Sequence, residues 1–351
     1  MVNPLYQHKS AITRRRLIIA FILCTIITVS IMTGFSKGLD SDGTIYTAEG
    51  TRIVMWNELP ESGTPEDFDA LTSFKYVAQR LYTAPYFKGD TVGDVVADLG
   101  IMKYKQHVHN TRVVKNGDVF SEAISSSSAK SIAEQKYIEG DIIIYRPSVK
   151  VSGDNVTWSD SAFRLAKEDY FRQYGVIPLE LAKHAIDEQT ILSVRDNNAA
   201  LQKSTVNDAQ SDGDETVDEG GVAYDVPQTL VKGDDGYYSI TFELDPYEST
   251  KYSRNEMRTL AGADNNPVIS YVAFTLVFDE RFIPISVSTA ERYDIEIPFL
   301  GAMSCSSTLT ETFYDVGGDG ELPYLDFFKS HMTDESGGEI PDAPKSPADY
   351  L

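Results

Sequence analysis

The feature that most constrains this chain is an uncharged run of nineteen residues, 17–35, which begins directly after Arg14, Arg15 and Arg16. At about 1.5 Å of helical rise per residue, the run would be about 28 Å long, close to the roughly 30 Å hydrocarbon core of a membrane. Basic residues gather on its N-terminal side, so the positive-inside rule predicts a cytoplasmic N-terminus. We therefore expect a single-pass signal-anchor at 17–35, a cell-membrane localisation and an extracytoplasmic domain after it.

A cleaved secretory signal is the alternative that the same run allows. The run is longer than the apolar stretch of about 7–15 residues in such signals, and a poor cleavage site follows it. Cys24 follows Leu23, whereas a lipobox has a small residue just before its cysteine, so we expect no lipoprotein anchor. Cys305, the second of the two cysteines, would lie across the membrane from Cys24. An exported domain without disulfides is typical of a bacterial or archaeal surface rather than of an animal ectodomain.

The charge of the chain limits its partners. All 53 acidic residues follow residue 37, and the formal net charge of the whole chain is −22. A domain this acidic repels the phosphates of nucleic acids and the headgroups of anionic lipids. We therefore expect no nucleic-acid partner.

Periodicity predicts one well-marked helix and many strands. Thr64-Pro65-Glu66-Asp67 is a helix start with a capping box, and apolar residues recur at helical spacing from Phe68 to Leu81, which predicts a helix over 64–82. Asn116-Gly117 between two alternating segments predicts a β-hairpin. The expected strands are 51–56, 102–115, 119–127, 136–138, 141–146, 149–158, 237–244, 268–278, 282–297 and 303–314, and short helices are expected at 167–174, 179–186 and 250–260.

These elements predict an α+β fold in which curved antiparallel sheets are covered by helices, arranged as two similar halves. A segment such as 203–221, which is rich in acids and poor in apolar residues, cannot bury enough surface to order itself. The expected segments are a cytoplasmic N-terminus (1–16), the transmembrane anchor (17–35), a membrane-proximal linker (36–63), a first α+β half (64–202), an acidic disordered linker (203–221), a second α+β half (222–330) and a disordered tail (331–351).

The order of these elements, a covering helix followed by a long antiparallel meander in an acidic domain, resembles the LolA/LppX-like half-barrel family over residues 64–316. Members of that family hold acyl chains or other apolar ligands in the concavity of the sheet. The resemblance rests on element order and alternation and not on a motif. The chain lacks the lipobox, and the segment 203–221 is not part of the family's pattern. Cystatin/NTF2-like halves would produce a similar sequence pattern.

The sheet of the second half is where we expect binding. Val272, Phe274 and Leu276 alternate along one predicted strand, and Ile285 and Val287 alternate along the next. Several strands there are apolar or neutral on both faces, so helices on one face would leave the other to be covered. The resemblance implies an apolar ligand such as a lipid, and a protein partner is the alternative.

One partial motif suggests a metal ion. Asp208, Asp212, Asp214 and Glu219 fall at ligand positions of an EF-hand-like loop, whose ion would be Ca²⁺. The loop has a poor third ligand and no evident flanking helices. We therefore expect no cofactor, with Ca²⁺ at this loop as the one alternative.

Residues suited to catalysis do not form a recognised motif. The sequence has no Gly-x-Ser-x-Gly, no His-Glu-x-x-His and no P-loop. His107 and His109 would share one face of a strand, but no third metal ligand accompanies them and we expect that strand to face solvent. We therefore expect a non-enzymatic protein that binds an apolar ligand or a protein partner. The alternatives are a structural or interaction module without a small ligand, and a hydrolase without a recognisable motif.

Overall fold

The computed structural model describes residues 44–46, 52–55, 62–100, 103–127, 131–139, 142–152, 155–166, 191–200, 226–247, 249–250, 265–297, 301–330 and 332–333 of the chain. The strands are β1 (Thr44–Tyr46), β2 (Arg52–Met55), β3 (Tyr86–Asp98), β4 (Lys103–Lys115), β5 (Asp118–Ser127), β6 (Ser131–Glu139), β7 (Ile142–Ser152), β8 (Asn155–Trp158), β9 (Ala162–Ala166), β10 (Ile191–Asp196), β11 (Tyr238–Leu244), β12 (Val268–Phe278), β13 (Pro284–Ile297), β14 (Gly301–Tyr314) and β15 (Met332–Thr333). The helices with described bounds are η2 (Pro65–Asp67), α2 (Ala70–Tyr82) and α6 (Leu325–Ser330).

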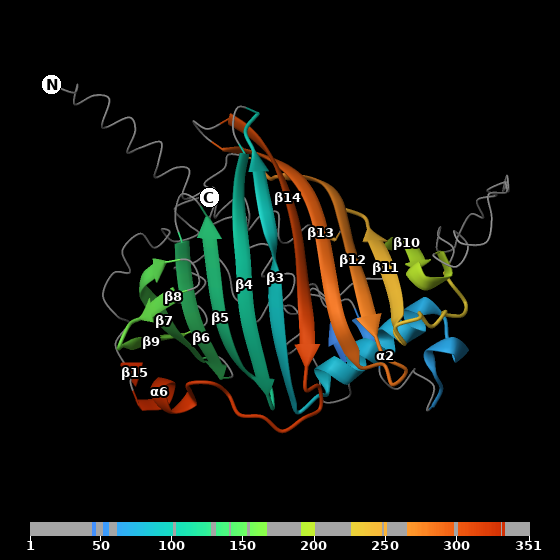
Figure 1. The fold of residues 1–351 in the computed structure, drawn as a ribbon, viewed down its shortest axis with the longest axis horizontal. Helices are drawn as coiled ribbons and strands as arrows, with labels where there is room; N and C mark the ends of the chain where they lie inside the picture. The colour runs from blue at the N-terminus through green and yellow to red at the C-terminus, as the bar shows by residue number, and fades with distance from the viewer. Residues whose placement is uncertain are drawn as a thin grey trace.

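One curved sheet of 13 strands dominates the structure (Figure 1). Its strand order is β10-β11-β12-β13-β14-β3-β4-β5-β6-β7-β9-β15, with β8 paired to β7 outside this path, while β1 and β2 form a separate pair. Strands that follow one another in the chain pair as antiparallel neighbours within β3–β7 and within β10–β14. The pairing of β14 with β3 then joins these two meanders edge to edge.

The hairpin between β4 and β5 shows how local sequence shapes this sheet. Asn116 and Gly117 have φ angles of 51° and 86°, and a two-residue turn with positive φ at both positions matches the right-handed twist of the strands that it joins. Lys115 consequently pairs with Asp118, and the register continues to Gln106 opposite Ser127. The predicted hairpin is confirmed.

The helix predicted over 64–82 is present as two separate pieces. The Thr64 backbone N–H donates to the Asp67 carboxylate over 2.8 Å and closes the capping box of η2. The chain then becomes extended, and Asp69 (φ −68°, ψ 166°) starts α2 by accepting a hydrogen bond from the Thr72 N–H over 2.7 Å. The reason for the break is that Asp69 acts as an N-cap, which requires non-helical backbone angles.

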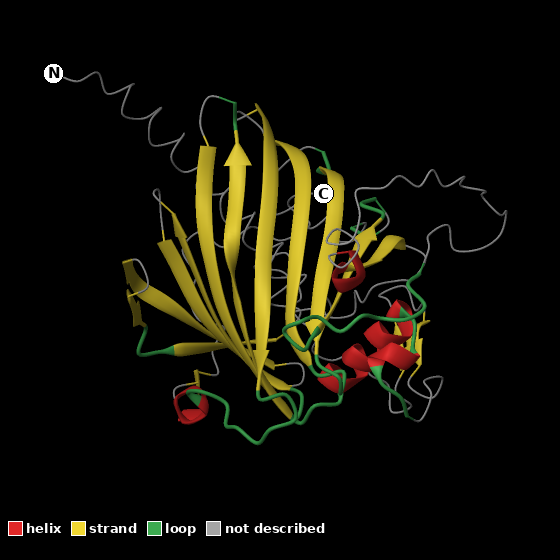
Figure 2. Cartoon of the chain, turned by 45° about the vertical axis from the view of Figure 1, so that its right-hand side comes forward, coloured by secondary structure: helices red, strands yellow, loops and turns green. Residues whose placement is uncertain are grey.

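Helices α2 and α6 lie on opposite faces of the sheet (Figure 2). We call the face that carries Phe242, Phe274 and Leu309 the inner face, and α2 packs against it at the β10–β13 end. The ring centroid of Phe74 on α2 lies 5.4 Å from that of Phe242 and 5.9 Å from that of Phe274. These aromatic contacts hold α2 on the sheet, because such pairs add to the burial of apolar area.

The second helix, α6, covers part of the outer face over β5–β7. Phe328 is fully buried there against Phe120 and Tyr137. The Arg146 guanidinium lies 3.8 Å from the centroid of the Phe327 ring, a cation–π contact that extends the same cluster. Residues 315–324 therefore carry the chain from the end of β14 to a distant part of the same sheet.

The predicted fold class, an α+β arrangement of two similar halves with helices covering the sheets, is wrong. The predicted halves belong to one continuous sheet, because β14 pairs with β3 from Ser304 opposite Asp98 to Tyr314 opposite Lys88. Helices account for a small part of the described chain and cover only limited areas of the sheet. The predicted helices at 167–174 and 179–186 and the predicted linker at 203–221 lie outside the described residues.

The membrane prediction also requires correction. In the part of the chain that the structure describes, no helix is long and apolar enough to cross a membrane. A spanning helix needs about 20 apolar residues, whereas α2 has 13 residues and α6 has 6. The run 17–35 lies outside the described residues. No described helix supports the predicted transmembrane signal-anchor or the cell-membrane localisation.

The packing of α2 leads to a first prediction. Replacing Phe74 by alanine should lower the free energy of unfolding by about 3–5 kcal/mol, because it removes an aromatic side chain from contact with Phe242 and Phe274. Urea denaturation of the full-length variant measures this change. Arg80→Ala on the exposed side of the same helix is the control and should change stability by less than about 0.5 kcal/mol. An equal loss in both variants would contradict this account of α2.

Candidate ligand-binding site

The register of the sheet determines which side chains share the inner face. Along β14 the buried residues alternate strictly with exposed or half-buried ones, and they are Met303, Cys305, Ser307, Leu309, Glu311 and Phe313. The buried apolar residues of this face form one continuous cluster. It extends from Ile191 and Val194 on β10 to Ile143 on β7. The inner face is thus an apolar surface that continues well beyond the end covered by α2.

Polar residues occupy several positions of this otherwise apolar face. They are Thr91, Gln106, Asn110, Arg112, Ser125, Thr289, Glu291, Ser307 and Glu311, and each is 6% exposed or less. None of these residues was predicted from the sequence to belong to a site. A signal was present, because Arg112 alternates in phase with Val108 and Val114, and Glu311 with Leu309 and Phe313. A charged residue in the apolar phase of a strand is rarely buried without a partner.

Arg112 and Glu311 form an ion pair at the centre of this polar group. The Nε and Nη2 atoms of Arg112 both donate to Oε1 of Glu311, over 3.1 and 2.8 Å, and both side chains are 1% exposed. The Arg112 guanidinium also lies 5.3 Å from the centroid of the Phe87 ring. Burial raises the pKa of Glu311 above its ordinary value, while the positive charge of Arg112 acts in the opposite direction.

Gly89 on β3 makes room for the ion pair. It lies between the two partner strands, opposite Phe313 on β14 and Arg112 on β4. A Cβ atom at Gly89 would lie 2.1 Å from Oε1 of Glu311, which is far inside van der Waals contact. A glycine in the interior of a strand weakens it but permits such a close approach. The pair can therefore cross β3 only because residue 89 has no side chain.

The ion pair leaves hydrogen-bonding capacity unused. Because both donor atoms of Arg112 point to one oxygen of Glu311, Nη1 of Arg112 and Oε2 of Glu311 have no partner among the described residues. The same is true of the Thr91 hydroxyl and of Oδ1 of Asn110, which lie beside the pair on β3 and β4. A buried polar atom without a partner costs about 1–3 kcal/mol. Four such atoms in one place are a candidate binding point for the polar part of a ligand.

Glu291 is a second buried acid on the inner face. It lies opposite Ser307, whose hydroxyl donates to Oε2 of Glu291 over 3.3 Å, while Oε1 has no partner among the described residues. Burial raises the pKa of Glu291 from 4.5 to about 7. Ser307 and Glu311 are four residues apart on β14, so Glu291 lies about 14 Å along the strand direction from the ion pair. This is not the close carboxylate pair of glycoside hydrolases.

The structure places most of the predicted binding residues on the inner face. Val272, Phe274, Leu276 and Val287 are buried in the apolar cluster there, and Ile285 is half-buried near the start of β13. Phe274 is in ring contact with Phe74 of α2. A ligand could reach Phe274 only if α2 moved, so the role of these five residues in binding stays a prediction.

The predicted metal-ligand residues are not brought together in the described structure. Asp208, Asp212, Asp214 and Glu219 lie outside the described residues, and the described residues contain no group of three or more side chains able to hold a metal ion. His107 is exposed on the outer face, where its Nδ1 atom lies 3.2 Å from Oδ1 of Asp94. The expectation that this strand faces solvent is confirmed at His107.

Cys305 lies on the inner face, opposite Tyr293, and is 4% exposed. Its neighbours on the strand, Ser304 and Ser306, point to the outer face and are exposed. Ser304 and Ser306 therefore point away from the thiol, whereas Ser307 shares the inner face with it.

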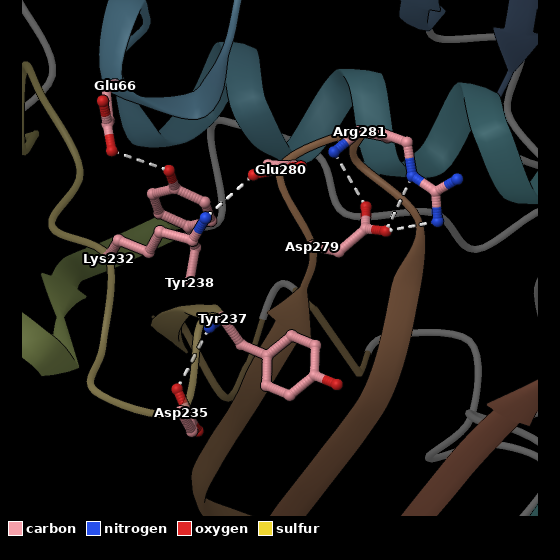
Figure 3. A network of polar contacts seen from close by, with 8 residues as sticks. All are labelled: Glu66, Lys232, Asp235, Tyr237, Tyr238, Asp279, Glu280 and Arg281. Atoms are coloured by element: carbon pink, nitrogen blue, oxygen red, sulfur yellow. Dashed lines mark hydrogen bonds and ion pairs between the residues drawn. The ribbon is translucent and has the colours of Figure 1, made fainter.

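Several polar contacts gather at one rim of the sheet, beside the segment that leads into α2 (Figure 3). The Tyr238 hydroxyl donates to Glu66 over 2.9 Å, and the Lys232 ammonium lies 2.8 Å from the Glu280 carboxylate. Burial, together with the hydrogen bond to Glu66, raises the pKa of Tyr238 to about 12. Beside them Arg281 donates to Asp279 over 3.1 and 2.9 Å. The Tyr238–Glu66 hydrogen bond holds η2 at this rim, while the other contacts lie at the turn between β12 and β13.

No protein-family model matches the sequence, and no curated protein matches it. Three solved structures are similar to part of the chain. The first, provisionally described as an outer membrane lipoprotein-sorting protein domain from Vibrio parahaemolyticus, has 9% identity and a TM-score of 0.21, and the match covers 69% of this chain and 89% of that one.

The second is a DUF1329 family protein from Desulfovibrio piger, with 10% identity, a TM-score of 0.20 and coverage of 73% and 96%. The third is a β-barrel-like protein of the domain of unknown function DUF1849 from Brucella abortus, with 8% identity, a TM-score of 0.19 and coverage of 66% and 100%. At these TM-scores the likeness carries no conclusion about this chain.

The buried ion pair leads to a second prediction. Arg112→Met alone should lower the free energy of unfolding by about 3–5 kcal/mol, because Glu311 would then be buried without its counter-charge. The double variant with Glu311→Met in addition should recover most of this loss, because two apolar side chains replace the pair. Urea denaturation of the full-length proteins measures both. Equal destabilisation by the single and double changes would show that the two side chains are not coupled.

The raised pKa of Glu291 leads to a third prediction. Between pH 4.5 and about 7 the folded protein holds a proton that the unfolded chain has lost, so this group makes stability fall as pH rises through that window. Glu291→Gln removes this dependence. The free energy of unfolding of the variant should therefore be about 3 kcal/mol higher than that of the wild type at pH 8. At pH 5 the difference should be much smaller.

Denaturation of the full-length protein at the two pH values tests this prediction. Glu296→Gln, which replaces an exposed acid on the same strand, is the matched control and should show little change at either pH. A difference between the Glu291 variant and the wild type that is the same at pH 5 and pH 8 would rule out a perturbed titration at Glu291.

Proposed function

We propose that this protein is a non-enzymatic binding protein that holds a ligand with an apolar body against the inner face of its sheet. One observation carries the proposal. The inner face is a continuous apolar surface that includes buried polar atoms without partners among the described residues. Ligand sites are typically lined by apolar side chains with a few convergent polar groups.

The ligand body is best accommodated beyond α2, over β3–β5. Val95 and Ala97 on β3 and Val108 on β4 are apolar inner-face residues of this region and are 6% exposed or less. They lie between the α2 end of the face and the far strands, which contribute Val119 and Ile138 to the same cluster. Because these side chains are buried, this part of the inner face has to become accessible before a ligand can bind there. We propose that this binding requires no cofactor.

A dye that fluoresces in apolar surroundings provides the fourth prediction. The full-length protein should bind Nile red saturably, and Val95→Phe should weaken this affinity about tenfold, because the added ring occupies inner-face volume. Val92→Phe is the matched control, since Val92 is on the same strand but is 44% exposed on the outer face. It should leave the affinity unchanged.

Melting temperatures of the same samples establish that each variant is folded. If Val95→Phe fails to fold, Ala97→Val makes a smaller intrusion on the same face and should weaken binding in the same direction. Native mass spectrometry of the gently purified protein should also show a co-purifying mass of lipid size. A folded wild type that binds no Nile red and carries no added mass would overturn the proposal and favour an interaction module without a small ligand.

A further inference from the structure

Four buried polar residues meet on three adjacent strands of the inner face, and we define them as the polar cluster: Thr91, Asn110, Arg112 and Glu311. Thr91 on β3 lies directly opposite Glu311 on β14 and Asn110 on β4. Arg112 follows Asn110 by two positions on β4, and its guanidinium reaches back across Gly89 to Glu311. Adjacent strands are about 4.8 Å apart, so these residues lie within reach of one small polar group.

The atoms of the polar cluster that have no partner define what that group must offer. Nη1 of Arg112 is a donor, Oε2 of Glu311 and Oδ1 of Asn110 are acceptors, and the Thr91 hydroxyl can act as either. A complementary group therefore needs donors for two acceptors and an acceptor for the guanidinium. A carboxylate offers acceptors only, and an ammonium offers donors only. Hydroxyl groups offer both.

The charges of the polar cluster also favour a neutral ligand group. The Arg112–Glu311 pair already balances one positive charge with one negative charge, and both side chains are 1% exposed. An added anion would face the Glu311 carboxylate, and an added cation would face the Arg112 guanidinium. Either would bring an uncompensated charge into a buried environment, where the loss of hydration is costly. A neutral group avoids this cost.

We propose that the polar cluster selects an amphiphile with a neutral head that carries hydrogen-bond donors and acceptors, such as the two hydroxyls of a monoacylglycerol. This inference rests on the proposed function and specifies its ligand class. The acyl chain of such a ligand would lie on the apolar residues beside the polar cluster, among them Val95 and Val108. The orientation of the ligand would then be determined by the polar cluster.

Ordered water at the four atoms is the alternative explanation, since buried waters commonly satisfy such groups. The two explanations differ in what they predict for amphiphiles of one chain length. A cluster filled by water has no influence on the choice of headgroup. A cluster that binds the head makes affinity depend on the head, because a polar site rejects an analogue that leaves its groups without partners.

Competition for Nile red tests the inference and is the fifth prediction. At pH 8 we expect 1-monolauroylglycerol to displace the dye from the full-length protein at least tenfold more effectively than laurate or dodecylammonium. Thr91→Val keeps the shape of the side chain and removes a buried hydroxyl without a partner, so the fold should tolerate it. It should reduce the preference for the glyceride, measured as the ratio of the displacement constants of the three amphiphiles on that variant, at least threefold.

Thr308→Val, an exposed threonine on the outer face of β14, is the matched control and should leave the preference intact. Asn110→Leu gives an independent second loss of preference. Equal displacement by the three amphiphiles, or an unchanged preference in both inner-face variants, would overturn the headgroup inference and leave the binding function standing. Failure of the folded wild type to bind Nile red or any of the three amphiphiles would overturn both.

Discussion

The pairing of β14 with β3 joins two stretches of chain that are far apart in sequence, and the rest of the structure depends on it. Arg112 on β4 and Glu311 on β14, which meet across β3, are 199 positions apart. Without this pairing the sheet would divide into a meander of β3–β9 and a meander of β10–β14, each with an exposed inner edge. The inner face would not be continuous, and neither the ion pair nor the polar cluster would be assembled. Neighbouring strands within each meander need only local contacts, whereas closing such a long loop costs more conformational entropy.

Two glycines on β3 make this pairing sterically possible. A Cβ atom at Gly93 would lie 2.1 Å from the backbone carbonyl oxygen of Thr308, and Gly89 leaves space for the carboxylate of Glu311. Both glycines are on the inner side of the strand, in phase with Phe87, Thr91 and Val95. They let β14 and the ion pair approach more closely than side chains would allow. The apolar contacts of Phe87 and Val95 then stabilise a strand that two glycines weaken.

Strands with regular alternation were predictable from the sequence, and β3 was not. The prediction for 268–278 matches β12, and 303–314 differs from β14 only at its start, because alternating apolar residues there reflect one buried face. β3 was missed because glycines occupy two of its inner positions and acids occupy several outer ones, and both residue types have low strand propensity. Pairing between distant strands leaves no local pattern, so the continuous sheet could not be inferred. The binding residues expected on β12 and β13 were apolar, whereas the polar cluster consists of residues whose types suggest the surface.

The buried ion pair constrains how β14 can pair with β3. A slip of one residue would move Glu311 to the outer face and would leave Arg112 buried without a counter-charge. A slip of two residues would keep Glu311 on the inner face but move it about 7 Å along the strand, away from the space at Gly89. Removing one partner from a buried pair costs about 3–5 kcal/mol, so either slip is strongly disfavoured. An apolar pair at these positions would tolerate a shift of two residues, because one buried apolar contact can replace another. The charges therefore select one register for the most distant pairing in the sheet, and that register is also the one that brings Thr91 and Asn110 beside the pair.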